Sequence, residues 1–180
     1  MAASLQSKMQ STISAVTGLD ESIFDTFEFQ PGVTPISSIY FPLITVLVYC
    51  VGIPSLQYFM KGHSAPPLKY ILIVHNVFLS IMSFFLAVFL CVTLLSIKTE
   101  NDFTFFPAIF CGLNHHHQIG TLQFIYYVNY LLKYYELLDT IFLALKHKKI
   151  GFLHAYHHPA TLVLTWGQMV DSTGVQWVVI

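Results

Sequence analysis

The sequence predicts an all-α integral membrane protein, a polytopic helix bundle, for two reasons. Of its 180 residues, 55% are hydrophobic and only 9% are charged, whereas soluble domains carry about 25% charged residues. In addition, residues 36–60 and 70–97 contain no Asp, Glu, Lys or Arg. A helix of about 20 apolar residues crosses the hydrocarbon core of a bilayer, so each of these segments is long enough to span it.

Two helices are expected in the first half of the chain. Residues 1–35 form a polar N-terminal tail that lacks the basic-then-apolar form of a cleaved signal peptide. The first membrane helix is expected at 36–60, with Gly52 and Pro54 bending its second half. A polar turn containing two prolines then leads to a second helix at 68–97.

Two more helices are expected in the second half. Residues 98–120 are predicted to be a loop or a partly re-entrant segment. A third helix, which carries charged residues, is expected at 121–145, and a fourth at 153–170. A short apolar segment then follows the turn "DSTG". We therefore expect about four full transmembrane helices and the start of a fifth, in a membrane domain (36–180) that is incomplete at its C-terminus.

The lysines predict the orientation of the chain, which has no arginine. Five of the eight lysines lie in the turns 61–69 and 146–150: Lys61, Lys69, Lys146, Lys148 and Lys149. Because positively charged turns face the cytosol, we expect both turns there and the N-terminus in the lumen. The net charge of -1 gives no reason to expect a nucleic-acid partner.

Four polar residues of the third helix form one stripe, which we call the polar stripe: Lys133, Glu136, Asp139 and Thr140. At about 100° per residue, Lys133, Glu136 and Thr140 fall within an arc of roughly 60°, and Asp139 lies roughly 60° beyond Glu136. Such a stripe must face the protein interior or a wet cavity. One lysine cannot neutralise two carboxylates, so we expect a further partner such as a cation, a bound ligand or a protonated carboxyl group. A purely structural network of ion pairs between helices is the alternative.

Three histidines begin the fourth helix, in the sequence "LHAYHH". His154, His157 and His158 span an arc of roughly 100° on one helix face. Buried polar rings in hydrocarbon are costly unless they are satisfied, so a cluster of three is a candidate functional site. An imidazole can act as a nucleophile or as an acid or base, and three imidazoles can also bind a metal. Hydrogen-bonded histidines that only pack helices are the structural alternative.

The pattern H-x-x-H-H leaves a metal enzyme as an alternative. Integral-membrane di-iron desaturases and hydroxylases use this pattern, but they need several such motifs on one side of the membrane. The other histidine-rich stretch, His115 to His117, is placed across the membrane from His154 by the predicted topology. We therefore expect no metal site, and a non-catalytic membrane helix bundle is the other remaining alternative.

The polar stripe and the three histidines together resemble the ELO family of very-long-chain fatty acid elongases. "KYYELLDT" matches the family pattern K-x-x-E-x-x-D-T, and "LHAYHH" matches H-x-x-H-H. The segment from Asn76 to Ser83 resembles an N-x-x-x-x-x-x-S element of the family. The resemblance covers residues 36–180 and implies a bundle of seven membrane helices.

Two features depart from the family pattern. The later family motif H-x-x-M-Y-x-Y-Y is absent from these residues and is expected beyond Ile180. In addition, Pro159 stands where the family has a small residue. Proline removes the hydrogen bond to the carbonyl of Ala155, so we expect the helix to bend there.

The resemblance implies a 3-ketoacyl-CoA synthase in the endoplasmic reticulum membrane. Such an enzyme condenses a long-chain acyl-CoA with malonyl-CoA and releases CoA and carbon dioxide, with no cofactor or metal. The resemblance implies that His157 carries the acyl group and that His154 and His158 position it. Glu136 and Asp139 would orient imidazoles, as carboxylates do in catalytic triads.

The remaining assignments concern charge and partners. Lys133, or an imidazolium, could stabilise the enolate that decarboxylation creates. Lys146, Lys148 and Lys149 stand where the phosphates of CoA would meet them, although they could equally serve as orientation signals alone. The expected partners are the bilayer, the two CoA thioesters and the other enzymes of the elongation cycle, and a homo-oligomer is left open.

Overall fold

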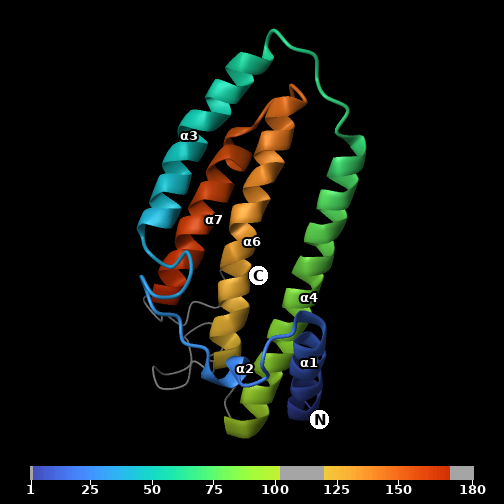
Figure 1. The fold of residues 1–180 in the computed structure, drawn as a ribbon, viewed down its shortest axis with the longest axis vertical. Coiled ribbons are helices and arrows are strands. Elements are labelled where there is room, and N and C mark those ends of the chain that lie inside the picture. Colours follow the sequence, from blue (N-terminus) through green and yellow to red (C-terminus); the bar gives the residue numbers. More distant parts are fainter. Residues whose placement is uncertain (1, 102–119, 171–180) are drawn as a thin grey trace.

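The computed structural model describes residues 2–101 and 120–170, without the side chains of 97–101. Every regular element in these residues is a helix (Figure 1). The helices are α1 (Ala2–Thr17), α2 (Ile23–Thr26), α3 (Tyr40–Met60), α4 (Lys69–Asn101), α6 (Gly120–Leu145) and α7 (Phe152–Val170). Most of the predicted loop at 98–120 and the apolar segment after residue 170 lie outside the described residues.

Helix α6 is the centre of the bundle. It packs against α2, α3, α4 and α7, and α3 also contacts α7. The connection from α3 to α4 and the turn from α6 to α7 lie at the same end of the bundle, while α1 and α2 lie at the other end (Figure 1). The two lysine-rich turns are therefore on one side, as predicted. Which side faces the cytosol stays a prediction.

The four long helices have the boundaries expected of a polytopic membrane protein. Within the described residues, α3 and the Lys69–Ser96 part of α4 are long and apolar enough to cross a membrane. Helices α6 and α7 have 26 and 19 residues but carry the polar stripe and the histidines. Large apolar side chains remain exposed on the outer faces of α3 and α4, among them Leu47, Val48, Ile71 and Phe84. Such faces suit contact with lipid chains.

The N-terminal segment differs from the expected polar tail, because it contains two helices that pack onto the bundle. Helix α1 contacts α4, and the Gln10 side-chain amide donates a hydrogen bond to Thr121 Oγ1 at 2.9 Å. Phe24 of α2 is fully buried and meets the rings of Phe89 and Phe124 edge-on, with centroids 6.2 and 5.1 Å away. The polar composition of residues 1–35 gave no indication that these helices pack onto the bundle.

The chain enters α3 through a tightly held turn. Ile36 has a φ of 59°, a conformation that costs a β-branched residue on the order of 1–3 kcal/mol. Three side chains of α6 and α7 donate to consecutive carbonyl groups here: Tyr127 to Pro35 (2.9 Å), Tyr130 to Ile36 (2.8 Å) and Trp166 Nε1 to Ser37 (2.7 Å). These bonds fix the start of α3 relative to the helices that carry the polar stripe and the histidines.

Candidate active site

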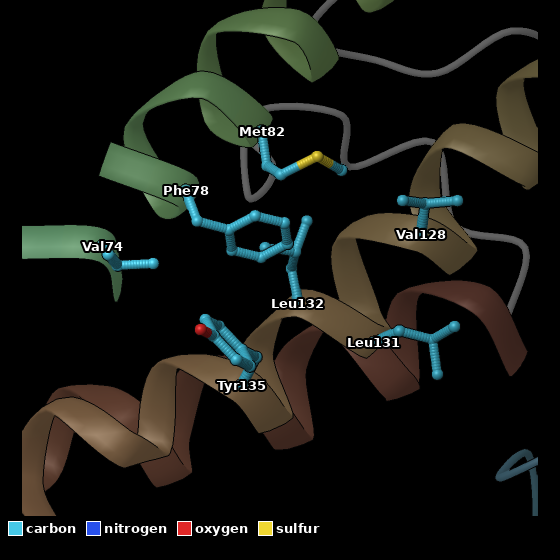
Figure 2. A pocket seen from close by; sticks show the side chains of 7 residues that line it. All are labelled: Val74, Phe78, Met82, Val128, Leu131, Leu132 and Tyr135. Carbon is cyan, nitrogen blue, oxygen red and sulfur yellow. The ribbon is translucent and has the colours of Figure 1, made fainter. Parts of the chain in front are cut away.

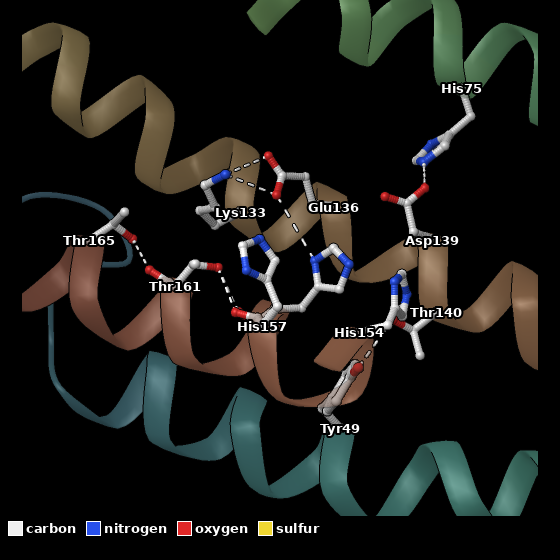
Figure 3. A network of polar contacts seen from close by, with 11 residues as sticks. Tyr49, His75, Lys133, Glu136, Asp139, Thr140, His154, His157, Thr161 and Thr165 are labelled. Carbon is white, nitrogen blue, oxygen red and sulfur yellow. Dashed lines mark hydrogen bonds and ion pairs between the residues drawn. The ribbon is translucent and has the colours of Figure 1, made fainter. Parts of the chain in front are cut away.

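Lys133 and Glu136 form an ion pair on α6. The ammonium nitrogen lies 2.7 Å from Oε1 and 2.9 Å from Oε2, so it contacts both carboxylate oxygens (Figure 3). Both side chains are partly buried. Because the two residues are three positions apart on one helix, the helix itself sets this contact.

Asp139 has a partner that the sequence did not predict. His75 of α4 places Nε2 2.8 Å from Asp139 Oδ1. The His75 ring is 2% exposed and packs against Tyr135 and Phe142, with centroids at 4.8 and 5.0 Å. His75 thus gives the second carboxylate of the polar stripe a hydrogen-bond partner. Asp139 was expected to orient one of the histidines of α7. Its hydrogen-bond partner is instead His75 of α4.

The three histidines of α7 form a row of contacting rings. His158 lies edge-on to His154 at 4.6 Å and to His157 at 5.6 Å. His158 is buried, and its Nδ1 lies 4.0 Å from Glu136 Oε2. His157 is exposed, and no hydrogen bond to its imidazole is formed by any residue in the described part of the chain. The structure therefore brings the histidines of α7 against the polar stripe of α6.

A second link between the stripe and the histidines runs through Thr140. Its Oγ1 lies 3.1 Å from His154 Nε2, and it accepts a hydrogen bond of 3.1 Å from the hydroxyl of Tyr49 on α3. Thr140 is fully buried and Tyr49 is 8% exposed. Three helices thus meet at one hydroxyl group (Figure 3).

Two residues of this network, His75 and Tyr49, were missed by the sequence analysis. His75 had a usable signal, because it is the only ionisable imidazole in the run 70–97 and ionisable groups inside a membrane helix are functional candidates. Tyr49 had none, since it is one of three tyrosines in α3 and tyrosine is common at membrane interfaces and in cores.

Pro159 lies inside α7, which continues through it from Phe152 to Val170. Proline cannot supply a backbone donor at this position. Two residues later, the Thr161 hydroxyl donates to the carbonyls of His157 (2.9 Å) and His158 (3.1 Å). These bonds lie next to the proline, whose missing donor concerns the carbonyl of Ala155.

The lysines of the α6–α7 turn, Lys146, Lys148 and Lys149, are exposed. They lie at the end of the bundle where α7 begins, and His154 is in the first turn of that helix (Figure 1). The turn itself bends sharply, with His147 at a φ of 54°. An anionic group bound by these lysines would be close to the first histidine of the row.

An apolar groove of about 400 Å³ lies between α4 and α6 (Figure 2). It is lined by Val74, Phe78, Met82, Val128, Leu131, Leu132 and Tyr135. Tyr135 contacts both the His75 ring and the Phe78 ring. The groove offers hydrocarbon surface beside the His75–Asp139 pair.

In residues 2–101 and 120–170, no three His, Cys, Asp or Glu side chains are grouped so that they could hold one metal ion. The second histidine-rich stretch, His115 to His117, lies outside the described residues. The di-iron alternative therefore has no support from the described part of the chain.

The Lys133–Glu136 ion pair, the His75–Asp139 contact and the histidine row inside a helix bundle define a class: a polytopic membrane protein with a histidine–carboxylate site. Within that class the chain belongs to the ELO family, because the model of the GNS1/SUR4 family matches residues 34–180. This match begins after α1 and α2, which are additional to the matched region.

Curated relatives agree with the family. The chain is similar to fatty acid elongase A of Dictyostelium discoideum, with 36% identity over 86% of this chain and 55% of the relative. It is also similar to fatty acid elongase sre1 of the same organism (37% identity, 85% and 54%) and to putative fatty acid elongase 1 of Schizosaccharomyces pombe (35%, 86% and 45%). The chain thus spans about half the length of these relatives. No solved structure matches it.

Proposed function

We propose that the protein acts in fatty acid elongation and condenses a long-chain acyl-CoA with malonyl-CoA to give a 3-oxoacyl-CoA, CoA and carbon dioxide. The single observation that carries the proposal is the contact between the two family motifs. Glu136 lies 4.0 Å from His158, and Thr140 lies 3.1 Å from His154. Two motifs that meet in space supply a nucleophile, carboxylates and a cation at one place.

In this proposal His157 is the nucleophile, because its imidazole is exposed and no side chain of the described residues occupies its nitrogens. His158 is buried, and His154 Nε2 is engaged by Thr140. The unprotonated His157 nitrogen attacks the thioester carbonyl, the carbon–sulfur bond breaks, and CoA leaves as a thiol with the proton that the imidazole loses from its other nitrogen. Decarboxylation of malonyl-CoA releases carbon dioxide and gives an enolate, whose carbon attacks the acyl-imidazole. The carbon–nitrogen bond then breaks, and the released imidazole takes a proton from solvent.

Charged residues support the two anions of this reaction. Lys133 lies next to Glu136 on the same face of α6, so its positive charge can stabilise the enolate oxygen. Lys146, Lys148 and Lys149 would hold the phosphates of CoA at the mouth of the bundle. The site would face the cytosol in the endoplasmic reticulum membrane, where the other enzymes of the elongation cycle could receive the product.

The proposal is tested with the full-length protein in proteoliposomes, supplied with a long-chain acyl-CoA and labelled malonyl-CoA. Labelled 3-oxoacyl-CoA should form, and Glu136→Gln should slow its formation by about 10²–10⁴-fold, the usual cost of losing an acid, base or orienting contact. Glu21→Gln, which changes an exposed acid outside the bundle, is the control. Absence of labelled product from the wild-type protein, or full activity of Glu136→Gln, would contradict the proposal.

A further inference from the structure

Tyr49 lies outside both family motifs, yet its hydroxyl reaches the histidine row through Thr140. The phenol donates to Thr140 Oγ1, and the same oxygen lies 3.1 Å from His154 Nε2. Figure 3 shows Tyr49, Thr140 and His154 meeting from three different helices. The contact is shielded, since Thr140 is fully buried and Tyr49 is 8% exposed.

The hydrogen atoms of this network determine the state of His154. Each hydroxyl has one hydrogen to donate, and a buried hydroxyl that does not donate loses a hydrogen bond. Tyr49 donates its hydrogen to Thr140. Within the described residues, the only other group hydrogen-bonded to Thr140 Oγ1 is His154 Nε2. The Thr140 hydrogen is therefore directed at Nε2, which must be unprotonated to accept it.

We infer that Tyr49 is a positioning residue, which acts through Thr140 to hold His154 as the neutral tautomer with its proton on Nδ1. The inference rests on the proposed function for its catalytic meaning. Without the phenol, Thr140 Oγ1 could accept a hydrogen bond from His154 instead, and the proton could move to Nε2. Tyr49 thus selects one of two arrangements that the Thr140–His154 pair alone would allow.

Fixing His154 also fixes the rest of the row. The His154 ring packs edge-on against His158 at 4.6 Å, and His158 contacts His157 at 5.6 Å. Glu136 lies near the other side of His158, at 4.0 Å from its Nδ1. Glu136 and Thr140, both on α6, therefore contact the row at His158 and at His154, and Tyr49 of α3 supports the second of these contacts.

The direct test is the tautomer of His154, measured by two-bond proton–nitrogen NMR spectra of the chain in micelles with ¹⁵N-labelled histidine. The His154 signals are assigned by their loss in His154→Gln. We expect a protonated Nδ1 and a bare Nε2 in the wild type, and a shift toward protonated Nε2 in Tyr49→Phe. Thr140→Ser keeps a hydroxyl and should preserve the wild-type tautomer, whereas Thr140→Val should lose it.

Tyr126→Phe is the matched control, because the Tyr126 hydroxyl is buried and has no hydrogen-bond partner among the described residues. It should leave the His154 spectrum unchanged. A protonated Nε2 in the wild type, or a Tyr49→Phe spectrum identical to that of the wild type, would overturn the inference. If Tyr49→Phe does not fold, a protonated Nε2 in the wild type still overturns the inference, and Thr140→Val tests the same link without changing Tyr49.

The link to catalysis is tested by a separate kinetic measurement. If the protein does not condense the two thioesters, the NMR test of the His154 tautomer still stands. In full-length protein that condenses, Tyr49→Phe should lower kcat about 10- to 100-fold, the usual cost of removing an outer partner of a functional histidine, with KM unchanged. A shifted tautomer with unchanged kcat would overturn the positioning role.

Discussion

His75 of α4 and Asp139 of α6 lie 2.8 Å apart, from Nε2 to Oδ1, across the contact between the two helices. His75 is almost fully buried, while the side chain of Asp139 is 29% exposed. A charged or hydrogen-bonded pair of this kind is costly to break on one side only, because the remaining partner stays buried without its hydrogen bond. The pair therefore fixes how α4 meets the polar stripe.

The first prediction is that His75 and Asp139 are energetically coupled. His75→Phe and Asp139→Leu should each lower the free energy of unfolding by about 1–3 kcal/mol, since each removes the hydrogen-bond partner of the other residue. The double variant should lose less than the sum, with a coupling of about 0.5–3 kcal/mol. Denaturant unfolding in mixed micelles gives the four values. Additive losses would show that the two side chains do not interact.

The second prediction concerns the contact between α2 and the start of α6. A Cβ atom added at Gly120 would lie 2.7 Å from the carbonyl oxygen of Asp25, a backbone atom that cannot rotate away. Gly120→Ala should therefore lower the free energy of unfolding by about 1–3 kcal/mol. Gly52→Ala is the matched control inside α3, where an added Cβ atom meets no atom of the other described residues within 4 Å, apart from the backbone of its own helix. It should be neutral or stabilising by up to about 1 kcal/mol, and equal effects would contradict the packing of α2.

The third prediction is the orientation, with the N-terminus in the lumen and the α3–α4 turn in the cytosol. The sequence contains no Asn-x-Ser/Thr acceptor for N-glycosylation. Single substitutions create one on each side: D20N before α2 and G62N after α3, both at exposed positions. Expressed in cells, D20N should gain a glycan and G62N should not, as read from gel mobility before and after glycosidase. A glycan on G62N alone would reverse the orientation.

The sequence predicted the four long helices because their apolar runs are bounded by clear breaks. The expected 121–145 and 153–170 correspond to Gly120–Leu145 and Phe152–Val170. The packing of α1 and α2 could not be predicted, since the burial of Phe24, one of three phenylalanines in residues 1–35, depends on contacts with α4 and α6. Contacts with distant helices leave no periodic signal.

The same limit applies to the candidate site. The spacing of Lys133 and Glu136 on one helix predicted a shared face, and they form an ion pair there. Helical spacing does not say which side chain of a neighbouring helix faces a given residue. Asp139 is paired with His75 of α4, and Thr140 is paired with Tyr49 of α3. These two pairings could be identified only from the structure.

The final prediction is that His157 carries the acyl group. It is the exposed member of the histidine row, whereas His158 is 7% exposed and His154 is bonded to Thr140. Full-length protein incubated with acyl-CoA alone should gain one acyl mass on the peptide containing His157, because no malonyl-CoA is present to remove it. His157→Ala should lose both the adduct and condensation. His158→Gln keeps a donor and an acceptor, so it should slow condensation but still form the adduct. An adduct of normal yield in His157→Ala would assign the nucleophile to another residue and leave His157 a structural role.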